Sequence, residues 1–351
     1  MSKNTNLNNS KDAGYDEYYT QLSDIEREVS HYQEYFKGKT VLCNCDDPRV
    51  SNFFKYFSLN FEYLGLKRLI ATCYKNQNAD LFSQHECERA VYIIYEGDKN
   101  NNGLPDPSEI EVKELKGDGD FASEECIELL KQADIVCTNP PFSLFLKFLQ
   151  VLFKYDKKFL ILGNMTQLNS LDVFSLVRDN KIWSGYEQFS GSRWFEIPMD
   201  HKGKNEKIVN GKKMVPIKAI WFTNLEVSKH HEPFIFYKQY REGDYPHYEN
   251  YDAIDVGTLS DIPDNYYGIM GVPVTFLEVY NPDEFEIVGS NCGTELLRDL
   301  GVGRLGEDWI RRYREAGGTG HNTANMIRLV YNDSEGLPHV AFSRILIRRK
   351  K

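Results

Sequence analysis

The chain has 351 residues, a formal net charge of −10, and 22 Tyr and 21 Phe residues. This supply of aromatic side chains is ample for a hydrophobic core, which excludes a wholly disordered chain. The length fits one large domain or two modest ones. The negative charge argues against a broad basic face but leaves room for local basic patches, which we expect at 202–213, 304–314 and 344–351.

The sequence contains no signal for a membrane span, for export or for a metal site. No apolar run approaches the roughly 20 residues that cross a bilayer, and the polar, Asn-rich first residues lack the apolar core of a signal peptide. The seven cysteines include no CxxC pair, so neither a zinc site nor a disulfide framework is indicated. We therefore expect a cytoplasmic protein with reduced thiols, no membrane contact and no bound metal.

The first predicted element is a helix over 22–36. Residues 1–13 are expected to be a disordered tail, and Tyr19 and Thr20 lie directly before the helical pattern. Ser23, with Glu26 three residues later, fits a capping box. A solvated helix start is the ordinary interpretation of this stretch.

A strand over 39–45 follows a glycine turn and leads into a polar loop and a helix over 51–61. Ligands of open α/β sheets bind beyond the carboxyl ends of the strands. Asn44, Asp46 and Asp47 are therefore candidate binding residues. The alternative for the acidic pair is an aspartate that caps the next helix.

The next elements are a strand over 67–74 and a hairpin that joins 90–95 to 110–115. Asp120 and Phe121 then follow Gly119, in a position where a ligand could sit. A plain glycine-rich turn is the alternative. A helix over 123–132 is predicted next, with Ser123 as its N-cap.

The most distinctive stretch is a strand over 135–137 that ends in Asn139, Pro140, Pro141 and Phe142. Prolines cannot donate to a ladder, so the strand must stop there, and Asn139 is held extended by the proline after it. The Asn139 amide oxygen and the Pro140 carbonyl could accept two hydrogen bonds from a planar amino group, while Phe142 offers a ring for stacking. An ordinary strand terminator is the alternative.

The second half of the chain changes in character. Periodic helices become rare after about residue 224, and we treat the adjacent pair His230 and His231 as surface residues. The remaining predictions are a helix over 171–179, strands over 159–162, 182–189, 194–197, 218–223, 268–275 and 285–289, and a loop over 202–215.

The loop at Asn139 matches the Asn-Pro-Pro-Phe signature of amino-group methyltransferases that use S-adenosylmethionine. Taken whole, the chain resembles the EcoRI-type adenine-specific DNA methyltransferases. The common glycine-rich GxG loop and the acidic ribose ligand are missing, and Tyr74 and Asn76 stand where the latter is expected. The resemblance is carried by residues 16–25, 43–48, 51–57, 69–74, 119–130, 134–142, 157–164, 221–225, 268–277 and 344–350.

The resemblance implies the Rossmann-like α/β fold of S-adenosylmethionine-dependent methyltransferases, a mixed sheet with helices on both faces. It places a cofactor-binding catalytic domain at 14–226 and a DNA target-recognition region at 227–351. The implied catalytic residues are Asn139, Pro140, Pro141 and Phe142. The implied cofactor residues are Tyr19, Thr20, Asn44, Asp46, Asp47, Asp120, Phe121 and Asn139.

The implied reaction is methylation of the N6 amino group of an adenine flipped out of double-stranded DNA. A cognate restriction endonuclease is a candidate partner, and a monomer would suit an enzyme that methylates one strand per encounter. Methylation of RNA or of a protein glutamine is the main rival. A nucleic-acid-binding protein that kept the fold without the chemistry is the second rival.

Overall fold

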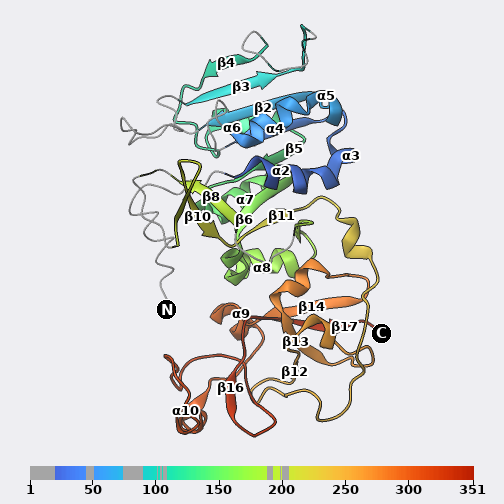
Figure 1. Cartoon of the computed structure of the whole chain (residues 1–351), viewed down its shortest axis with the longest axis vertical. Coiled ribbons are helices and arrows are strands. Elements are labelled where there is room, and N and C mark those ends of the chain that lie inside the picture. Colours follow the sequence, from blue (N-terminus) through green and yellow to red (C-terminus); the bar gives the residue numbers. More distant parts are fainter. Residues whose placement is uncertain are drawn as a thin grey trace. The chain divides into compact units, whose positions relative to one another are not determined.

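The computed structural model describes residues 20–44, 51–73, 90–100, 102, 105, 109–187, 193–197, 199 and 205–351. The chain, drawn whole in Figure 1, separates into two compact units. The first unit comprises residues 1–165 and 184–225, and the second comprises 166–183 and 226–351. Residues 166–183 therefore pack with the C-terminal part of the chain rather than with their sequence neighbours.

The large sheet of the first unit has the strand order β4-β3-β2-β1-β5-β6-β11-β7 within the described residues (Figure 1). Strand β1 pairs in parallel with β2 and β5, and β5 pairs in parallel with β6. Strands β3, β4 and β11 join in antiparallel fashion, which confirms the predicted mixed sheet. Its strands are β1 Thr40–Asn44, β2 Arg68–Cys73, β3 Val91–Tyr95, β4 Glu111–Glu114, β5 Ile135–Thr138, β6 Lys158–Asn164, β7 Trp183–Ser184 and β11 Ala219–Thr223.

Helices cover both faces of this sheet. Every residue of β1 and β5 is buried, and successive side chains of a strand point to opposite faces. The crossover from β1 to β2 runs in the opposite direction to the crossover from β5 to β6, so right-handed connections place α4 and α7 on opposite faces. The helices of this unit are α2 Leu22–Val29, α3 Gln33–Phe36, α4 Asn52–Leu59, α5 Phe61–Leu64, α6 Glu124–Gln132 and α7 Phe145–Lys154.

Serine side chains cap the starts of two helices: Ser123, as predicted, and Ser51, which was not predicted as a cap. The Ser51 hydroxyl accepts a hydrogen bond from the Phe54 amide, and the Ser123 hydroxyl accepts one from the Cys126 amide. The capping box at Ser23 is wrong. Helix α2 begins at Leu22, because the carbonyl of Gln21 already accepts the first helical hydrogen bonds.

A second, three-stranded antiparallel sheet of the first unit is formed by β8 Arg193–Ile197, β10 Lys212–Ile217 and β9 Lys207–Val209. The predicted loop over 202–215 is therefore wrong for 207–215. Asn210 and Gly211 both have positive φ, of 51° and 79°, and two such residues make the tight turn that matches the twist of a hairpin.

The second unit is built on a sheet of order β12-β13-β17-β14 and a two-stranded ribbon of β15 and β16. Helix α8 lies against β14, as does α9. Its strands are β12 Ile254–Asp255, β13 Ile269–Pro273, β14 Phe285–Ser290, β15 Val330–Asn332, β16 Pro338–Val340 and β17 Arg344–Arg349. Its helices are α8 Leu171–Arg178, α9 Thr294–Asp299 and α10 Gly306–Glu315.

Short 3₁₀ helices occur in both units. They cover Ser30–Tyr32, Phe142–Leu144, Met165–Asn169, Ser228–His231, Leu259–Asp261 and Val274–Glu278.

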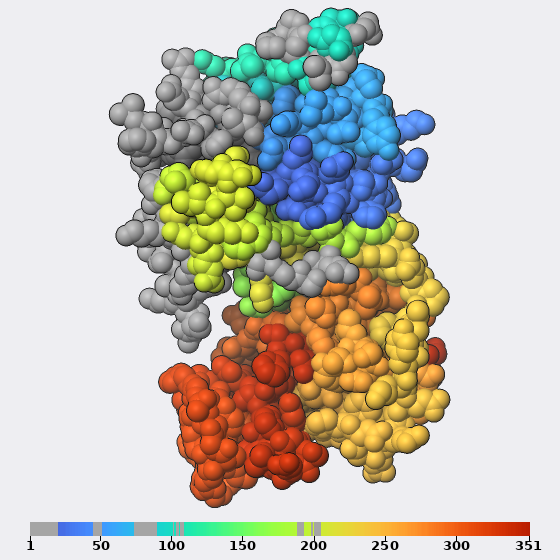
Figure 2. Space-filling view, viewed as in Figure 1, coloured from blue at the N-terminus to red at the C-terminus, as the bar shows by residue number. Residues whose placement is uncertain are grey.

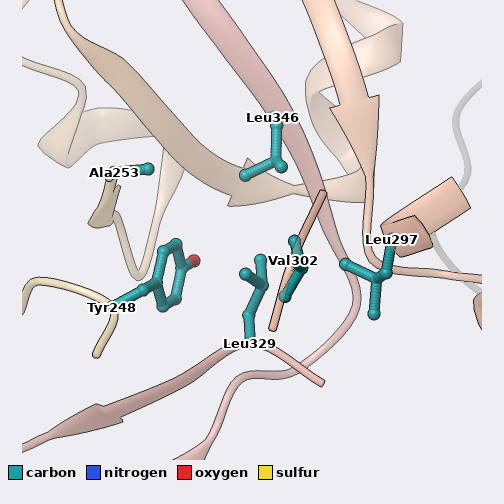
Figure 3. Close-up of a cluster of buried hydrophobic side chains, with 6 residues drawn as sticks. All are labelled: Tyr248, Ala253, Leu297, Val302, Leu329 and Leu346. Carbon is teal, nitrogen blue, oxygen red and sulfur yellow. The ribbon is translucent and has the colours of Figure 1, made fainter. Parts of the chain in front are cut away.

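Two kinds of contact hold the second unit together. Figure 3 shows a buried apolar cluster made of Tyr248, Ala253, Leu297, Val302, Leu329 and Leu346. Beside it, the Arg344 guanidinium donates two hydrogen bonds to the carboxylate of Asp255, at 3.0 and 3.1 Å, and both side chains are buried. A paired and hydrogen-bonded arrangement is what allows these charges to be buried.

Two further expectations from the sequence need correction. His230 is 1% exposed and not a surface residue, because its ring stacks on Trp183 and its Nδ1 lies 2.7 Å from the Tyr280 carbonyl oxygen. Cys73 is disulfide-bonded, whereas Cys43, Cys126, Cys137 and Cys292 are thiols that take part in no disulfide. A disulfide depends on how close the side chains lie in space, which sequence spacing does not report.

Two features are absent from the described residues. None of the helices there has the length and apolar character needed to cross a membrane. No group of His, Cys, Asp and Glu side chains in the same residues is arranged to hold a metal ion.

Candidate active site

The site begins where the strand order of the large sheet reverses, between β1 and β5. In open α/β sheets this reversal leaves a crevice at the carboxyl ends of the strands, where ligands bind. The two strand ends are tied together here, because the Thr138 hydroxyl at the end of β5 donates to the main-chain carbonyl of Asn44 at the end of β1. Thr138 is 1% exposed and Asn44 is 6% exposed.

The loop from Asn139 to Phe142 leaves β5 at this point. Asn139 and Pro140 are buried and Pro141 is half-buried. The Leu144 amide donates to the Pro141 carbonyl at 2.9 Å, which closes a short turn that leads directly into α7. The two prolines have fixed φ angles and no amide hydrogen, so the loop is stiff and its carbonyls are not part of a ladder.

The Phe142 ring forms one wall of this region. It is 2% exposed and packs edge to face on Phe195 of β8, with the ring centroids 6.3 Å apart. A ring buried to this extent does not present an open face. A planar ligand can stack on Phe142 only if the side chains that cover the ring move aside.

The loop that carries Asp120 and Phe121 reaches the same edge of the sheet. Gly119 has φ +82°, and a Cβ built on it would lie 2.3 Å from the carbonyl oxygen of Cys73, the last residue of β2. Only glycine fits this position. The Asp120 carboxylate accepts a hydrogen bond from the Ala122 amide at 2.7 Å, which orders the turn after it.

Helix α7 connects this loop to the Asn139 loop. Phe121 packs edge to face on Phe148 of α7, with the centroids 5.0 Å apart. On the same helix, Lys147 Nζ lies 3.5 Å from Asp120 Oδ2 and 5.0 Å from the centre of the Phe121 ring. Sequence reasoning missed Lys147. Its signal was a charged residue in a helical stretch that is otherwise largely apolar.

The buried side-chain oxygens at this edge that have no hydrogen-bond partner among the described residues include Thr20 Oγ1 and Asn44 Oδ1. The Thr20 carbonyl accepts a hydrogen bond from Asn52 Nδ2 at 2.8 Å, which fixes the segment before α2 to the start of α4. A buried polar atom without a partner costs free energy, so such atoms often await a ligand. These two oxygens could accept hydrogen bonds from ammonium or hydroxyl groups.

Comparison with known proteins assigns the chain. Residues 6–350 match the family described as adenine-specific methyltransferase EcoRI. The chain belongs to this family. It is an enzyme, an adenine-specific methyltransferase, and the resemblance predicted from its sequence is confirmed.

Curated relatives match most of the chain. The type II methyltransferase M.EcoRI of Escherichia coli is 46% identical over 302 residues, which cover 84% of this chain and 92% of the relative. M.MgeORF184P of Mycoplasma genitalium is 40% identical over 292 residues, 80% of this chain and 85% of the relative. M.MpnI of Mycoplasma pneumoniae is 36% identical over 292 residues, which cover 80% of this chain and 84% of the relative. No solved structure matches the chain.

The fold of this methyltransferase brings most of the predicted site residues to one edge of the sheet. Thr20, Asn44, the Asp120 loop and the Asn139 loop all lie at the carboxyl ends of β1, β2 and β5, or beside the start of α4. The predictions for Tyr19, Asp46 and Asp47 fall outside the described residues.

The site offers acceptors and rings rather than a strong base. Complete burial raises the pKa of the Cys137 thiol, so this cysteine stays protonated and is a poor nucleophile. The Asn139 side chain does not titrate. An arrangement of this kind can orient a neutral amino group toward an electrophile, but it is not built to remove a proton beforehand.

Proposed function

We propose that this protein transfers a methyl group from S-adenosylmethionine to the N6 amino nitrogen of an adenine at a specific site in double-stranded DNA. The observation that carries the proposal is the stiff Asn139–Phe142 loop at the carboxyl end of β5. It lies where the strand order reverses, in a chain that belongs to the adenine-specific methyltransferase EcoRI family.

The residues around the strand ends fit the cofactor. Asp120 can accept a hydrogen bond from the amino group of its adenine, and Phe121 can pack beside that ring. The buried oxygens of Thr20 and Asn44 can accept hydrogen bonds from its ammonium or ribose groups. Asp46 and Asp47 stay the predicted partners of the ammonium group, and Tyr19 stays a predicted cofactor contact. When bound, the cofactor supplies a methyl group activated by a sulfonium.

Asn139 and Pro140 hold the target amino group. The Asn139 amide oxygen and the Pro140 carbonyl accept its two N–H hydrogen bonds, which favours a pyramidal nitrogen whose lone pair is no longer shared with the ring. Because this geometry is reached only near the transition state, the hydrogen bonds stabilise it more than the ground state. The fixed loop also aligns the nitrogen with the methyl group.

The proposed methyl transfer needs no base on the enzyme. The N–C bond forms as the C–S bond breaks, and S-adenosylhomocysteine leaves as a neutral thioether. The methylated nitrogen then carries an extra proton, which it releases to water. A protonated Cys137 and a non-titrating Asn139 are consistent with this order of events.

The target adenine must leave the duplex to reach this loop, which costs a few kcal/mol. Stacking of the flipped base on Phe142 would return about 1–3 kcal/mol. Because Phe142 is buried against Phe195, stacking requires the wall around the ring to open when DNA binds. The proposed sequence-reading region is 227–351, and the proposed state is a cytoplasmic monomer with a cognate restriction endonuclease as candidate partner.

The test is methyl transfer from labelled S-adenosylmethionine to unmethylated duplex DNA, followed by nucleoside analysis of the product. We expect the label in N6-methyladenine, and no further uptake by DNA that the enzyme has already methylated. Label that enters RNA or a protein glutamine, and not DNA, would overturn the proposed substrate. Cofactor binding without any transfer would identify a protein that kept the fold and lost the reaction.

A further inference from the structure

The second unit contains a cavity of about 270 Å³ that none of the site residues described above lines. Its walls come from residues 327–329, from residues 340–343 and from the start of α9 at Gly293 and Thr294. One side of the cavity is well packed, because Leu297 and Leu329 line it and also belong to the buried cluster in Figure 3. No Asp or Glu is among its described lining residues.

Arg328 lines this cavity and brings a cationic side chain to it. It is exposed, and no carboxylate of the described residues lies within ion-pair distance of it. Arg314 and Arg349 likewise have no ion-paired carboxylate among the described residues, whereas four other arginines of the predicted basic patches are neutralised. Their partners are Asp308 for Arg311, Glu249 for Arg312, Asp255 for Arg344 and Glu286 for Arg348.

Arg304 lies on a segment that pairs with the backbone next to Arg328, although it is not among the residues that line the cavity. Its backbone forms a β-bridge with Ile327, and its guanidinium donates to the side-chain oxygen of Asn325 at 3.3 Å, with no ion-paired carboxylate among the described residues. Asn250 fixes both segments, because its Nδ2 donates to the carbonyls of Gly303 and Arg328 at 3.1 and 2.7 Å. The two cations therefore project from a rigid backbone.

Phe342 adds a large aromatic side chain to the rim. Its side chain is 77% exposed, while its carbonyl accepts a hydrogen bond from Asn291 Nδ2 at 2.6 Å. The backbone is thus held in place although the ring contacts little of the protein. An exposed aromatic ring next to an unneutralised arginine is a combination enriched in binding interfaces.

The chemistry of this surface suits a nucleic acid. The guanidinium group of an arginine donates hydrogen bonds to phosphate oxygens and to the acceptor atoms of guanine. An apolar ring packs on a base or on a thymine methyl group. The cavity between them has room for part of a nucleotide and no acidic lining residue to repel phosphate. The Arg328 guanidinium, which has no ion-paired carboxylate among the described residues, also provides local positive charge on a chain of net charge −10.

We propose that Arg328 and Phe342, which both line this cavity, form a DNA-contact surface of the enzyme, here called the Arg328 surface. Arg328 donates to acceptor atoms of the duplex that carries the target adenine, and Phe342 packs against a base. This proposal rests on the proposed function and assigns contacts within the region that the sequence could only mark as DNA-reading.

The test compares Arg328→Ala with Arg241→Ala. Arg241 is a matched control, since it is also an exposed arginine of the second unit without an ion-paired carboxylate among the described residues. The probe is a short fluorescein-labelled duplex that carries the methylation site mapped with the wild-type enzyme. We expect Arg328→Ala to raise the Kd for this duplex by about tenfold or more, and Arg241→Ala to leave it unchanged.

Two further measurements test the same surface: DNA binding by a Phe342 variant, and the sequence and salt dependence of binding by the Arg328 variant. Phe342→Ala should weaken binding, whereas Tyr237→Ala, at another aromatic side chain that is 71% exposed, should not. If Arg328 contacts a phosphate, its variant loses affinity equally for all sequences and the salt dependence becomes shallower. If it contacts a base edge, discrimination against altered sites is relaxed instead. Either pattern supports the Arg328 surface.

The result that overturns the inference is equal DNA binding by Arg328→Ala and Arg241→Ala when the wild-type enzyme methylates DNA normally. A wild-type enzyme that neither binds nor methylates DNA would instead overturn the proposed function, so the two failures are distinguishable. Cofactor affinity and thermal unfolding, which exposed substitutions should leave unchanged, verify that each variant is folded.

Discussion

The hydroxyl of Thr138, at the end of β5, donates a hydrogen bond to the main-chain carbonyl of Asn44, at the end of β1. The two strands pair at Val41 and Leu42, well before their carboxyl ends. The side-chain hydrogen bond therefore extends the connection beyond the last paired residues, to the carboxyl ends of both strands. It couples the loop predicted to be catalytic, which follows Thr138, to a predicted cofactor residue.

Replacing Thr138 by valine tests whether this hydrogen bond supports both the stability of the fold and the binding of the cofactor. The change keeps the shape but removes the donor, so the buried carbonyl of Asn44 loses its partner at a cost of about 1–3 kcal/mol. We expect a lower free energy of unfolding and weaker binding of S-adenosylmethionine. Thr138→Ser keeps the hydroxyl and should bind the cofactor nearly as wild type, measured by isothermal titration calorimetry. Equal affinities for the two variants would contradict the role given to the hydroxyl.

Gly119 should be intolerant of any side chain. Alanine there would combine positive φ, which costs about 1 kcal/mol or more, with a Cβ placed 2.3 Å from the Cys73 carbonyl oxygen. The loop with Asp120 and Phe121 must shift, so we expect the Kd for the cofactor to rise about tenfold or more. Gly117→Ala is the control in the same stretch, because its Cβ would meet only the Glu125 carboxylate, at 3.6 Å. Unchanged affinity in Gly119→Ala would show that this loop does not serve the cofactor.

The buried ion pair of the second unit should matter far more than an exposed one on the same strand. Asp255→Ala leaves the Arg344 guanidinium buried without its carboxylate, which should cost about 3–5 kcal/mol. Arg348→Ala breaks an exposed pair with Glu286, whose atoms are 3.6 Å apart, and should cost less than about 1 kcal/mol. Urea unfolding followed by fluorescence measures both. Similar losses for the two variants would mean that Asp255 does not stabilise the unit as described.

His231 should make a small contribution to stability that depends on pH. Hydrogen bonds to the carboxylates of Asp283 and Glu226 raise the pKa of His231 above its usual value of about 6.5. Because the folded-state pKa is the higher one, the stabilisation is complete below the unfolded value and is lost as the pH rises through the folded value. The exposed position keeps the gain below about 1 kcal/mol. The stability difference between wild type and His231→Gln should shrink with rising pH, and a difference that grows would contradict the assignment.

The sequence predicted the parts of this protein that depend on local chemistry. Ser123 caps its helix as predicted, the two prolines follow the end of β5, and the predicted mixed sheet is present. The Asn139 loop was recognisable because proline geometry restricts the backbone whatever surrounds it.

What the sequence could not predict depends on packing between distant segments. Whether Phe142 is open or covered depends on Phe195, which lies on another sheet. His230 is buried because Trp183 lies against it, although the two are far apart along the chain. The partners of Lys147 and Arg344 are likewise set by the fold, so neither their roles nor the lack of a carboxylate partner at Arg328 could be read from charge patterning.

The most direct test of the account is the rate of a single methyl transfer by Asn139→Ala, measured together with its affinity for S-adenosylmethionine. Without the amide oxygen, the amino group is no longer held in its reactive geometry. We expect the rate to fall about 100-fold or more, a loss typical of one transition-state hydrogen bond, while the Kd for the cofactor stays near the wild-type value. A rate close to wild type, or an affinity that falls in step with the rate, would contradict the role of the Asn139 loop in catalysis.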